Sequence, residues 1–551
     1  MRRSRVLLVL AVLLGGCSGK FTPSLDPIGH EPFFPGLGDR TRPITTSSPE
    51  AQKYFDQGLS FLYAFNHDEA IRSFQRATEL DPDCAMAWWG ISIANGPHIN
   101  NPVVPPERGE LGFDTWRAAH ERAANGTEAE QALIEALGHR YADPPPDNRA
   151  ALDKAYADAM RGVWQRFPND ADVGALFAES MMDLRPWDLW THDGQAQPGT
   201  EEIVTTLESV MAVDPNHPLA LHLYIHAVEA SLNPARAEQA ADRLRDLQPG
   251  LGHLVHMPSH IDVRTGDWEK CVVANTNAIR ADRAYRALRP RQGFYGLYIA
   301  HNYHMLAYGG MMVGRQKEAV RAMDDLVASM PQSWANQFSA IADGYMVMPL
   351  EVRVRFGMWR EIIAAPEFPK QFPFARAMRH YARGIAHASE NHFQSARAEQ
   401  RAFELKKAKV PPEAFFGNNK ASDLLNIAEF MLEGEISFRE GRPEAGLQAL
   451  RQAVAREDAL RYDEPPSWIL PSRHALGASL LRAERWSEAE AVFREDLHRL
   501  PRNGWGLYGL MRSLQAQGRT ADAAEVEREF NEVWADSDIK LTSPCFCQPR
   551  I

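Results

Sequence analysis

The stretch AQKYFDQGLSFLYAFNHDEAIRSFQRATELDP, residues 51–82, decides the fold of this chain. Its apolar residues recur with a helical period, and small and large residues occupy fixed places along it. Small residues allow two antiparallel helices to approach closely, large residues fill the seam between them, and a proline ends the second helix. The stretch therefore predicts a helix pair with the landmarks Tyr54, Gly58, Phe61, Ala70, Phe74 and Pro82.

A second copy of these landmarks lies near the end of the chain, at Leu476, Gly477, Leu480, Ala489, Phe493 and Pro501. Both copies resemble the tetratricopeptide repeat, whose pattern is W-x2-LG-x2-Y followed by A-x3-F and a proline. The resemblance implies an all-α fold, a right-handed superhelical solenoid of antiparallel helix pairs. It also implies that the first helix of each pair lines the concave face.

Weaker copies connect the two strong ones, starting near Pro218, Gly252, Ala300, Ala377, Ile427 and Gly504. Two segments, 97–113 and 185–200, break the helical period and are predicted to be loop insertions. The second segment carries Trp187 and Trp190, which favour an ordered flap over a disordered loop.

These patterns predict the domain organisation. We expect a signal peptide at 1–16, a flexible tether at 17–48, an N-terminal array with a histidine-lined groove at 49–335, an irregular helical connector at 336–376, a C-terminal array at 377–536 and a tail at 537–551.

The N-terminus has the three parts of an export signal in order. A basic MRRSR segment is followed by the short apolar run VLLVLAVLL and then by LGGC, which ends at Cys17. This arrangement resembles the lipobox of bacterial lipoproteins, and the resemblance implies that Cys17 is lipidated and becomes the mature N-terminus. We therefore expect a protein of the cell envelope that is anchored to the membrane by lipid. Because Ser18 follows the cysteine, the outer membrane, with the protein facing the periplasm, is the expected location.

The composition is that of a soluble globular chain of 551 residues, with 44% hydrophobic and 24% charged residues. The net charge of -12 gives no electrostatic reason to bind nucleic acid, and we interpret it as a solubilising charge. The sequence has no HExxH, Walker A, GxSxG or dinucleotide-binding motif, so no catalytic residue is assigned.

Histidines recur at the repeat interval in the middle of the chain. In the register set by Pro249 and Pro331, the second, fifth and ninth positions of three successive repeats are nearly all histidine. In tetratricopeptide repeats these positions, with the twelfth, usually face the groove. The expected groove residues are His222, His226, Glu229, His253, His256, His260, His301 and His304.

Residues four apart share a helix face, so His222 can approach His226, and His256 can approach His260. Imidazoles from neighbouring helices can share one metal ion, and zinc, copper, nickel and iron all accept such ligands. The eight residues are therefore predicted metal ligands. We expect five of them to converge, namely His222, His226, His256, His260 and His304, with His253, His301 and Glu229 at the edge. Binding of an anion or a peptide carboxylate by the same histidines is an alternative, and so is a purely structural hydrogen-bonded cluster.

Three functional interpretations follow from these residues. The first is a lipid-anchored helical-repeat protein whose histidine groove binds a transition metal or a metal-dependent ligand. The second is a metal-free scaffold for proteins or peptides of the cell envelope, and the third is a metalloenzyme that uses the histidine cluster. The pair Cys545 and Cys547 near the end suits either Cu(I) binding or an oxidised tail, and its role stays open.

Overall fold

The computed structural model describes residues 31–291 and 293–548. The predicted signal peptide, the lipidation site Cys17 and the first part of the tether lie outside the described residues. The chain folds into two compact units. The described part of the first unit comprises residues 31–261, 277–291 and 293–299, and that of the second comprises residues 262–276 and 300–548.

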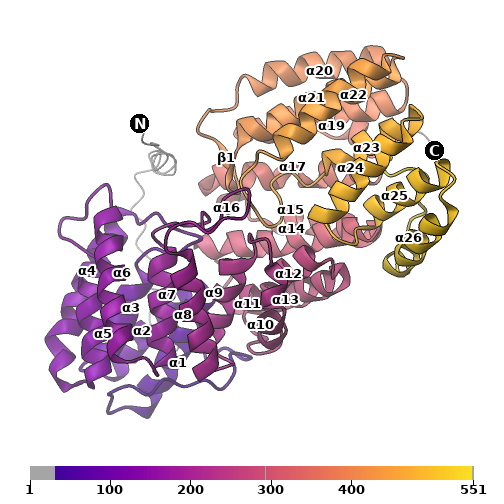
Figure 1. The fold of residues 1–551 in the computed structure, drawn as a ribbon. Coiled ribbons are helices and arrows are strands. Elements are labelled where there is room, and N and C mark those ends of the chain that lie inside the picture. The colour runs from indigo at the N-terminus through magenta and orange to yellow at the C-terminus, as the bar shows by residue number, and fades with distance from the viewer. Residues whose placement is uncertain (1–30, 292, 549–551) are drawn as a thin grey trace, which may run out of the picture. The chain divides into compact units, whose positions relative to one another are not determined.

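The first unit is built of helices joined by short turns and by longer irregular segments (Figure 1). In chain order they are α1 (Pro49–Tyr63), α2 (His67–Leu80), α3 (Ala85–Ala94), α4 (Pro106–Arg122), η1 (Ala123–Asn125), α5 (Glu128–Gly138), α6 (Ala150–Arg166), α7 (Ala171–Met182), α8 (Thr200–Val213), α9 (Pro218–Val228), η2 (Pro234–Ala237), α10 (Glu238–Leu244) and α11 (Gly252–His256). Residues of both units occur in α12 (Pro258–Thr265), α13 (Trp268–Leu288) and α14 (Gly296–Met312), and η3 (Gly293–Tyr295) precedes α14.

The second unit continues with helix pairs. Its elements are α15 (Gln316–Ser329), α16 (Gln332–Gln337), α17 (Ser339–Arg355), α18 (Trp359–Ala364), α19 (Pro373–Ser389), α20 (Phe393–Lys407), β1 (Phe415–Phe416), β2 (Asn419–Lys420), α21 (Ala421–Arg439), α22 (Pro443–Glu457), α23 (Ser472–Arg482), α24 (Trp486–Arg499), α25 (Gly504–Ala516) and α26 (Thr520–Val533). Among the described residues, the hairpin of β1 and β2 is the only ladder of paired strands. The predicted all-α class of antiparallel helix pairs is therefore confirmed.

The landmark residues act as the sequence predicts. A Cβ atom on Gly58 or on Gly90 would come within 2.5 Å of the Phe74 ring, so only glycine leaves room for that ring between α1, α2 and α3. In the second unit the ring of Phe493 lies in the same way against Gly477 and Gly509, where an added Cβ would come within 2.3 Å. Helix starts follow the usual rules, because Asn66 caps α2 and proline is the first residue of α1, α4 and α9.

The described part of the predicted tether, residues 31–48, packs against the first unit. Arg42 makes two hydrogen bonds to Asp170, at 2.8 and 2.9 Å, and one of 2.8 Å to Asp172. Arg40 pairs with Asp172 at 3.1 Å and with Asp214 at 2.5 Å. The segment is therefore a strap held by partly buried ion pairs. The Gly and Pro content of the segment led us to predict a flexible linker, but composition alone does not show whether an extended segment packs against the helices that follow it.

Two other boundaries differ from the predictions. The predicted loop 97–113 is helical from Pro106 onward, because proline is favourable in the first turn of a helix. The predicted connector 336–376 contains α17, which packs on α19 and so belongs to the array. The segment 185–200 is an ordered flap, in which the Trp190 indole donates to the carbonyl of Ala227 at 2.8 Å.

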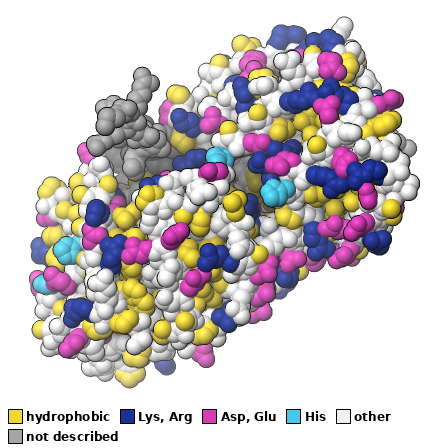
Figure 2. All heavy atoms as spheres, viewed as in Figure 1, with side chains coloured by type: hydrophobic (Ala, Val, Ile, Leu, Met, Phe, Trp, Pro, Cys, Tyr) yellow, Lys and Arg dark blue, Asp and Glu magenta, His cyan; other side chains and the backbone are white. Residues whose placement is uncertain are grey.

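Charged side chains of both signs are intermixed over the face of the molecule shown in Figure 2. This distribution agrees with a solubilising role for the net charge. In the part of the chain that the structure describes, no helix is long and apolar enough to cross a membrane.

Candidate metal centre

Three short helices of the first unit position the candidate ligands. His222 and His226 lie one turn apart on α9, and Glu229 caps the end of that helix. His253 and His256 lie on α11, while His260 follows on α12. The helix is interrupted between α11 and α12 because Pro258 has no backbone N–H and cannot continue the hydrogen-bond pattern of α11.

The structure brings these side chains together. Ring centroids are 5.0 Å apart for His222 and His226, 4.9 Å for His222 and His253, 5.3 Å for His226 and His260, and 4.8 Å for His256 and His260. We call the set His222, His226, Glu229, His253, His256 and His260 the histidine core.

The histidine core is buried and does not line an open groove as the repeat register predicted. His222 is completely inaccessible, and Glu229 retains 1% exposure. The Phe65 ring lies 4.5 Å from that of His222, Trp187 of the flap lies 5.2 Å from His226, and Tyr298 lies 4.5 Å from His253. These aromatic rings close the site from several sides, and the repeat pattern alone gave no sign of them.

Hydrogen bonds fix which nitrogen of each α9 histidine carries the proton. Nδ1 of His222 lies 2.8 Å from the carbonyl of Tyr63, which can only accept, so Nδ1 is protonated and Nε2 keeps its lone pair. Nδ1 of His226 donates in the same way to Glu229 Oε1 at 2.7 Å. Both Nε2 atoms are buried without a hydrogen-bond partner among the described residues. Two bare imidazole lone pairs therefore lie within the core.

Glu229 orients two histidines at once. Its Oε1 accepts from Nδ1 of His226, and its Oε2 accepts from Nδ1 of His260 at 2.6 Å. Burial alone would raise the pKa of Glu229, but the attraction of His260 and the hydrogen bonds from both rings outweigh it and hold that pKa at about 2. When one ring nitrogen of a histidine binds a metal ion, the N–H at the other nitrogen usually donates to a carboxylate or carbonyl, which fixes the tautomer and the orientation of the ring.

The electrostatic environment keeps the α9 imidazoles neutral. Burial, reinforced by the neighbouring His226, holds the pKa of His222 well below its ordinary value. Burial also lowers the pKa of His226, although Glu229 opposes the shift. A neutral imidazole is the form that binds metal ions, so these ligands need not lose a proton before binding.

Among the residues of the first unit, two groups of three ligand atoms are close enough to hold an ion. One nitrogen each from His222, His226 and His253 lie within 4.8 Å of one another. The same holds for ligand atoms of His226, Glu229 and His260. Ligands of a tetrahedral ion with bonds of about 2.0–2.1 Å lie about 3.4 Å apart, so small rotations of the rings suffice.

Two further histidines, His67 and His98, lie near the histidine core, and sequence reasoning missed both of them. Nδ1 of His67 lies 3.0 Å from the carbonyl of Ala94, and its Nε2 is buried without a partner among the described residues. Burial and nearby arginines lower the pKa of His67 to about 3. His98 lies 4.4 Å from His67 and 4.4 Å from Phe65, measured between ring centroids. Neither follows the repeat register: His67 starts a second helix, and His98 lies in an irregular segment.

A small pocket opens beside these two histidines. Its cavity volume of about 20 Å³ is enough for one water molecule or a small ion. The pocket is lined by Phe65, His67, Asn95, His98, Arg108 and Tyr295, among others. The Phe65 ring lies in contact with both the pocket and His222, which makes it the boundary between the pocket and the histidine core.

The last two predicted ligands belong to the second unit. His301 is partly exposed on α14, and His304 is buried on the same helix, 6.1 Å from Tyr345 and 6.0 Å from Phe416 between ring centroids. Burial lowers the pKa of His304 to about 3. Within the described residues, no group of three potential ligand atoms includes His304, so the structure does not place it in a metal site.

Comparison with known proteins gives little further guidance. No protein-family model and no curated protein matches the chain. Solved structures similar to it include a human IFIT1 dimer with m7Gppp-AAAA (10% identity, 90% of this chain and 92% of that chain, TM-score 0.33). A second is the APC/C hetero-tetramer Cut9–Hcn1, with 11% identity over 89% of this chain and 74% of that chain and a TM-score of 0.31. A third is yeast Tom70, with 10% identity over 88% of this chain and 90% of that chain and a TM-score of 0.27. TM-scores this low carry no argument, and the class of this protein, an all-α array of helix pairs, rests on its own helices.

Proposed function

We propose that the first unit binds one transition metal ion in the histidine core, with Nε2 of His222, Nε2 of His226 and a nitrogen of His253 as ligands. The observation that carries the proposal is the pair of Nε2 atoms on α9. Both Nε2 atoms are buried and have no hydrogen-bond partner in the described structure. Both are unprotonated, because in each neutral ring the hydrogen bond at Nδ1 places the proton there. Three imidazole ligands suit zinc, copper, nickel and iron.

Glu229 would orient ligands rather than bind the ion. Each of its two oxygens already accepts a hydrogen bond from a histidine Nδ1, so the carboxylate fixes the tautomers of His226 and His260. The buried position favours a closed, structural or storage site, since a catalytic site keeps a coordination position open to substrate. The metalloenzyme interpretation would need the flap or Phe65 to move.

Elemental analysis of the untagged protein tests the proposal. We expect about one zinc, copper, nickel or iron ion per chain, and we expect it to be lost from a His222→Ala/His226→Ala variant. His139, which is exposed at the end of α5, gives the control His139→Ala, which should keep the metal. A metal-free wild-type protein, after dialysis against each of these ions, would favour the metal-free scaffold. A fully loaded double variant would refute these ligands.

We also propose that the protein is anchored to the outer membrane by a lipid on Cys17. The support is the basic segment, the short apolar run and the LGGC sequence, all of which precede the described residues. Cys17→Ser should move the protein from the membrane fraction to the soluble fraction of the envelope. Unchanged fractionation of that variant would contradict the anchor and leave the metal site unaffected.

A further inference from the structure

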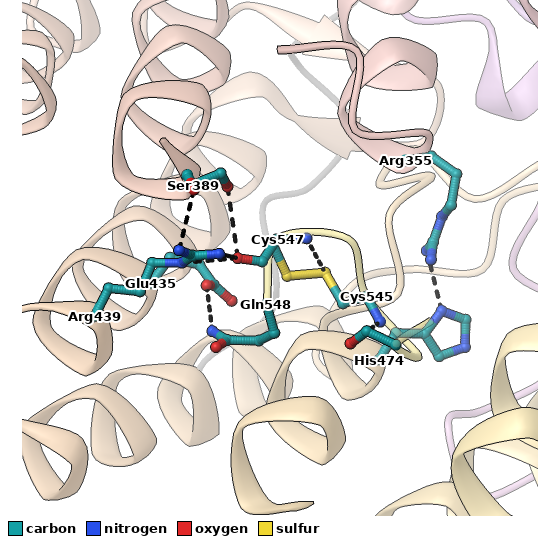
Figure 3. Close-up of a disulfide and its surroundings, with 9 residues drawn as sticks. Arg355, Ser389, Glu435, Arg439, His474, Cys545, Cys547 and Gln548 are labelled. Carbon is teal, nitrogen blue, oxygen red and sulfur yellow. Dashed lines mark hydrogen bonds between the residues drawn. A yellow bond between two sulfur atoms is a disulfide. The ribbon is translucent and has the colours of Figure 1, made fainter. Parts of the chain in front are cut away.

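The C-terminal segment of the second unit, which the sequence analysis described only as a tail at 537–551, packs against helices. Residues 541–548 follow α26, and within them Ser543, Cys547 and Gln548 retain at most 3% exposure. Figure 3 shows this segment between Arg439 and Ser389 on one side and Arg355 and His474 on the other. Termini are usually poorly ordered unless specific contacts hold them, so the contacts of this tail need an explanation.

Arg439, the last residue of α21, binds the backbone of the tail. Its Nε and Nη2 donate to the carbonyl of Cys547 at 2.9 and 2.5 Å. Its Nη1 donates to the carbonyl of Ser389, the last residue of α19, at 3.1 Å. A forked donor set on one carbonyl recognises a peptide backbone and requires no particular side chain.

Two further contacts recognise side chains. The Gln548 amide donates to Oε2 of Glu435 at 2.6 Å, and both groups are buried. The Phe546 ring lies 5.3 Å from Trp505 of α25, in an edge-to-face arrangement. The tail thus presents an aromatic ring, a backbone carbonyl and an amide at three successive residues.

The helices that contact the tail share one position in the array, because each is the first helix of its pair. The helices α19, α21 and α25 are each the first of a consecutive pair, with α20, α22 and α26 as the second members. First helices also pack on one another, as α19 packs on α21. The tail therefore crosses from the last pair to earlier pairs along a face that first helices provide.

A disulfide shapes the tail where it is bound. Cys545 and Cys547 are joined, and the backbone N–H of Gln548 donates to the carbonyl of Cys545 at 3.0 Å. The resulting tight turn holds the Cys547 carbonyl toward Arg439 and the Gln548 side chain toward Glu435 (Figure 3). A preformed turn loses less conformational entropy on binding than a flexible segment does.

We propose that this face of the second unit, with Arg439, Glu435 and Trp505, is a peptide-binding site, and that the tail occupies it as an intramolecular ligand. The partner that fits is a protein segment with an aromatic residue followed at two residues by an amide side chain, and it binds by displacing the tail. Backbone and amide contacts of this kind can be reproduced by another chain.

The covalent link between the tail and the second unit makes the displacement measurable. A segment linked to its site acts at an effective concentration on the order of 1 mM. A free peptide with a dissociation constant of about 10 μM would therefore bind the intact chain roughly 100-fold more weakly than a chain without the tail.

The test uses a labelled synthetic peptide, LTSPCFCQPRI, which reproduces residues 541–551 in oxidised form. Fluorescence anisotropy should show 1:1 binding to protein that ends at Lys540, and binding at least tenfold weaker to the intact chain. Adding Arg439→Ala to the shortened protein should weaken binding at least tenfold. Arg401→Ala, at an exposed position on the second helix α20, should leave it unchanged. Equal binding to intact and shortened protein, or none to a shortened protein of unchanged helicity, would overturn the proposal.

A second measurement covers the case in which the shortened protein does not fold. In the full-length chain, Arg439→Ala should increase amide hydrogen exchange in residues 545–548 at least tenfold, while Arg401→Ala should not. An unchanged exchange rate in the Arg439 variant would mean that this residue does not hold the tail, and the proposal would fail. Neither readout depends on metal content.

Discussion

Replacing Glu229 by glutamine tests the histidine core most directly, because the change keeps the shape of the side chain and alters only its hydrogen bonds. Both oxygens of Glu229 accept, one from Nδ1 of His226 and the other from Nδ1 of His260. Glutamine offers one acceptor and one donor group, so one of the two histidines must change its tautomer. If His226 changes, its Nε2 acquires a proton and can no longer bind a metal ion.

The expected size of the effect follows from two sources. Loss of a residue that orients a metal ligand reduces metal affinity about 10- to 100-fold, which corresponds to roughly 1.4–2.8 kcal/mol. Loss of hydrogen bonds to a buried charge reduces the free energy of unfolding of the metal-free protein by about 1.5–3 kcal/mol. The pKa of Glu229 near 2, below its ordinary value of 4.5, means that its own contribution is present above about pH 4.5 and is lost as the pH falls toward 2.

Competition with a chromophoric chelator measures the affinity, and urea denaturation of the apoprotein measures the stability. Glu238→Gln, at an exposed position on α10, is the matched control and should change neither. The reasoning is refuted if Glu229→Gln is folded and binds the metal within threefold of wild type. It is also refuted if the control loses affinity to the same extent.

Three further predictions concern stability and access. Because burial lowers the pKa of His304 to about 3, unfolding of the chain adds a proton to this residue below about pH 6.5. The contribution of His304 to the free energy of unfolding should therefore fall by about 2 kcal/mol between pH 7.5 and 5, and His304→Leu should reduce the pH-dependent loss measured by urea denaturation by that amount. Arg42→Ala leaves Asp172 partly uncompensated and should reduce the free energy of unfolding of the first unit by about 3 kcal/mol, measured by the same method. Trp187→Ala uncovers His226 without removing a ligand, so metal release to a chelator should become at least tenfold faster while circular dichroism stays unchanged.

Much of the fold could be predicted because the repeat landmarks are local. Gly58 and Phe74 determine one helix pair, Gly477 and Phe493 another, and the spacing of each set is visible in the sequence. The strap at 31–48 could not be predicted, because its order depends on ion pairs such as Arg42 with Asp170, more than 120 residues away. The docked tail was missed for the same reason, since Cys547 meets Arg439 only in the folded second unit.

The approach of the α9 and α11 histidines to one another could be foreseen from their spacing, but their burial could not. Burial depends on Phe65, whose backbone has a φ of 56°, and on Trp187 in an irregular flap. A helical register carries no information about either residue. The register also gave His304 the same place in its repeat as His222, whereas the structure surrounds His304 with Tyr345 and Phe416.

The strongest reason to expect a ligand in the first unit is the free-energy cost of its histidines. Nε2 of His67, His222 and His226 are each buried without a partner among the described residues, and leaving a buried polar atom unsatisfied costs about 1–3 kcal/mol. Together the three amount to about 3–9 kcal/mol, which is comparable to the whole net stability of a typical domain, about 5–15 kcal/mol. Leucine or phenylalanine at these positions would fill the space without that cost. An ion that accepts the lone pairs of His222 and His226 removes their share of this cost in the folded state alone, because the unfolded chain does not bring α9 and α11 together.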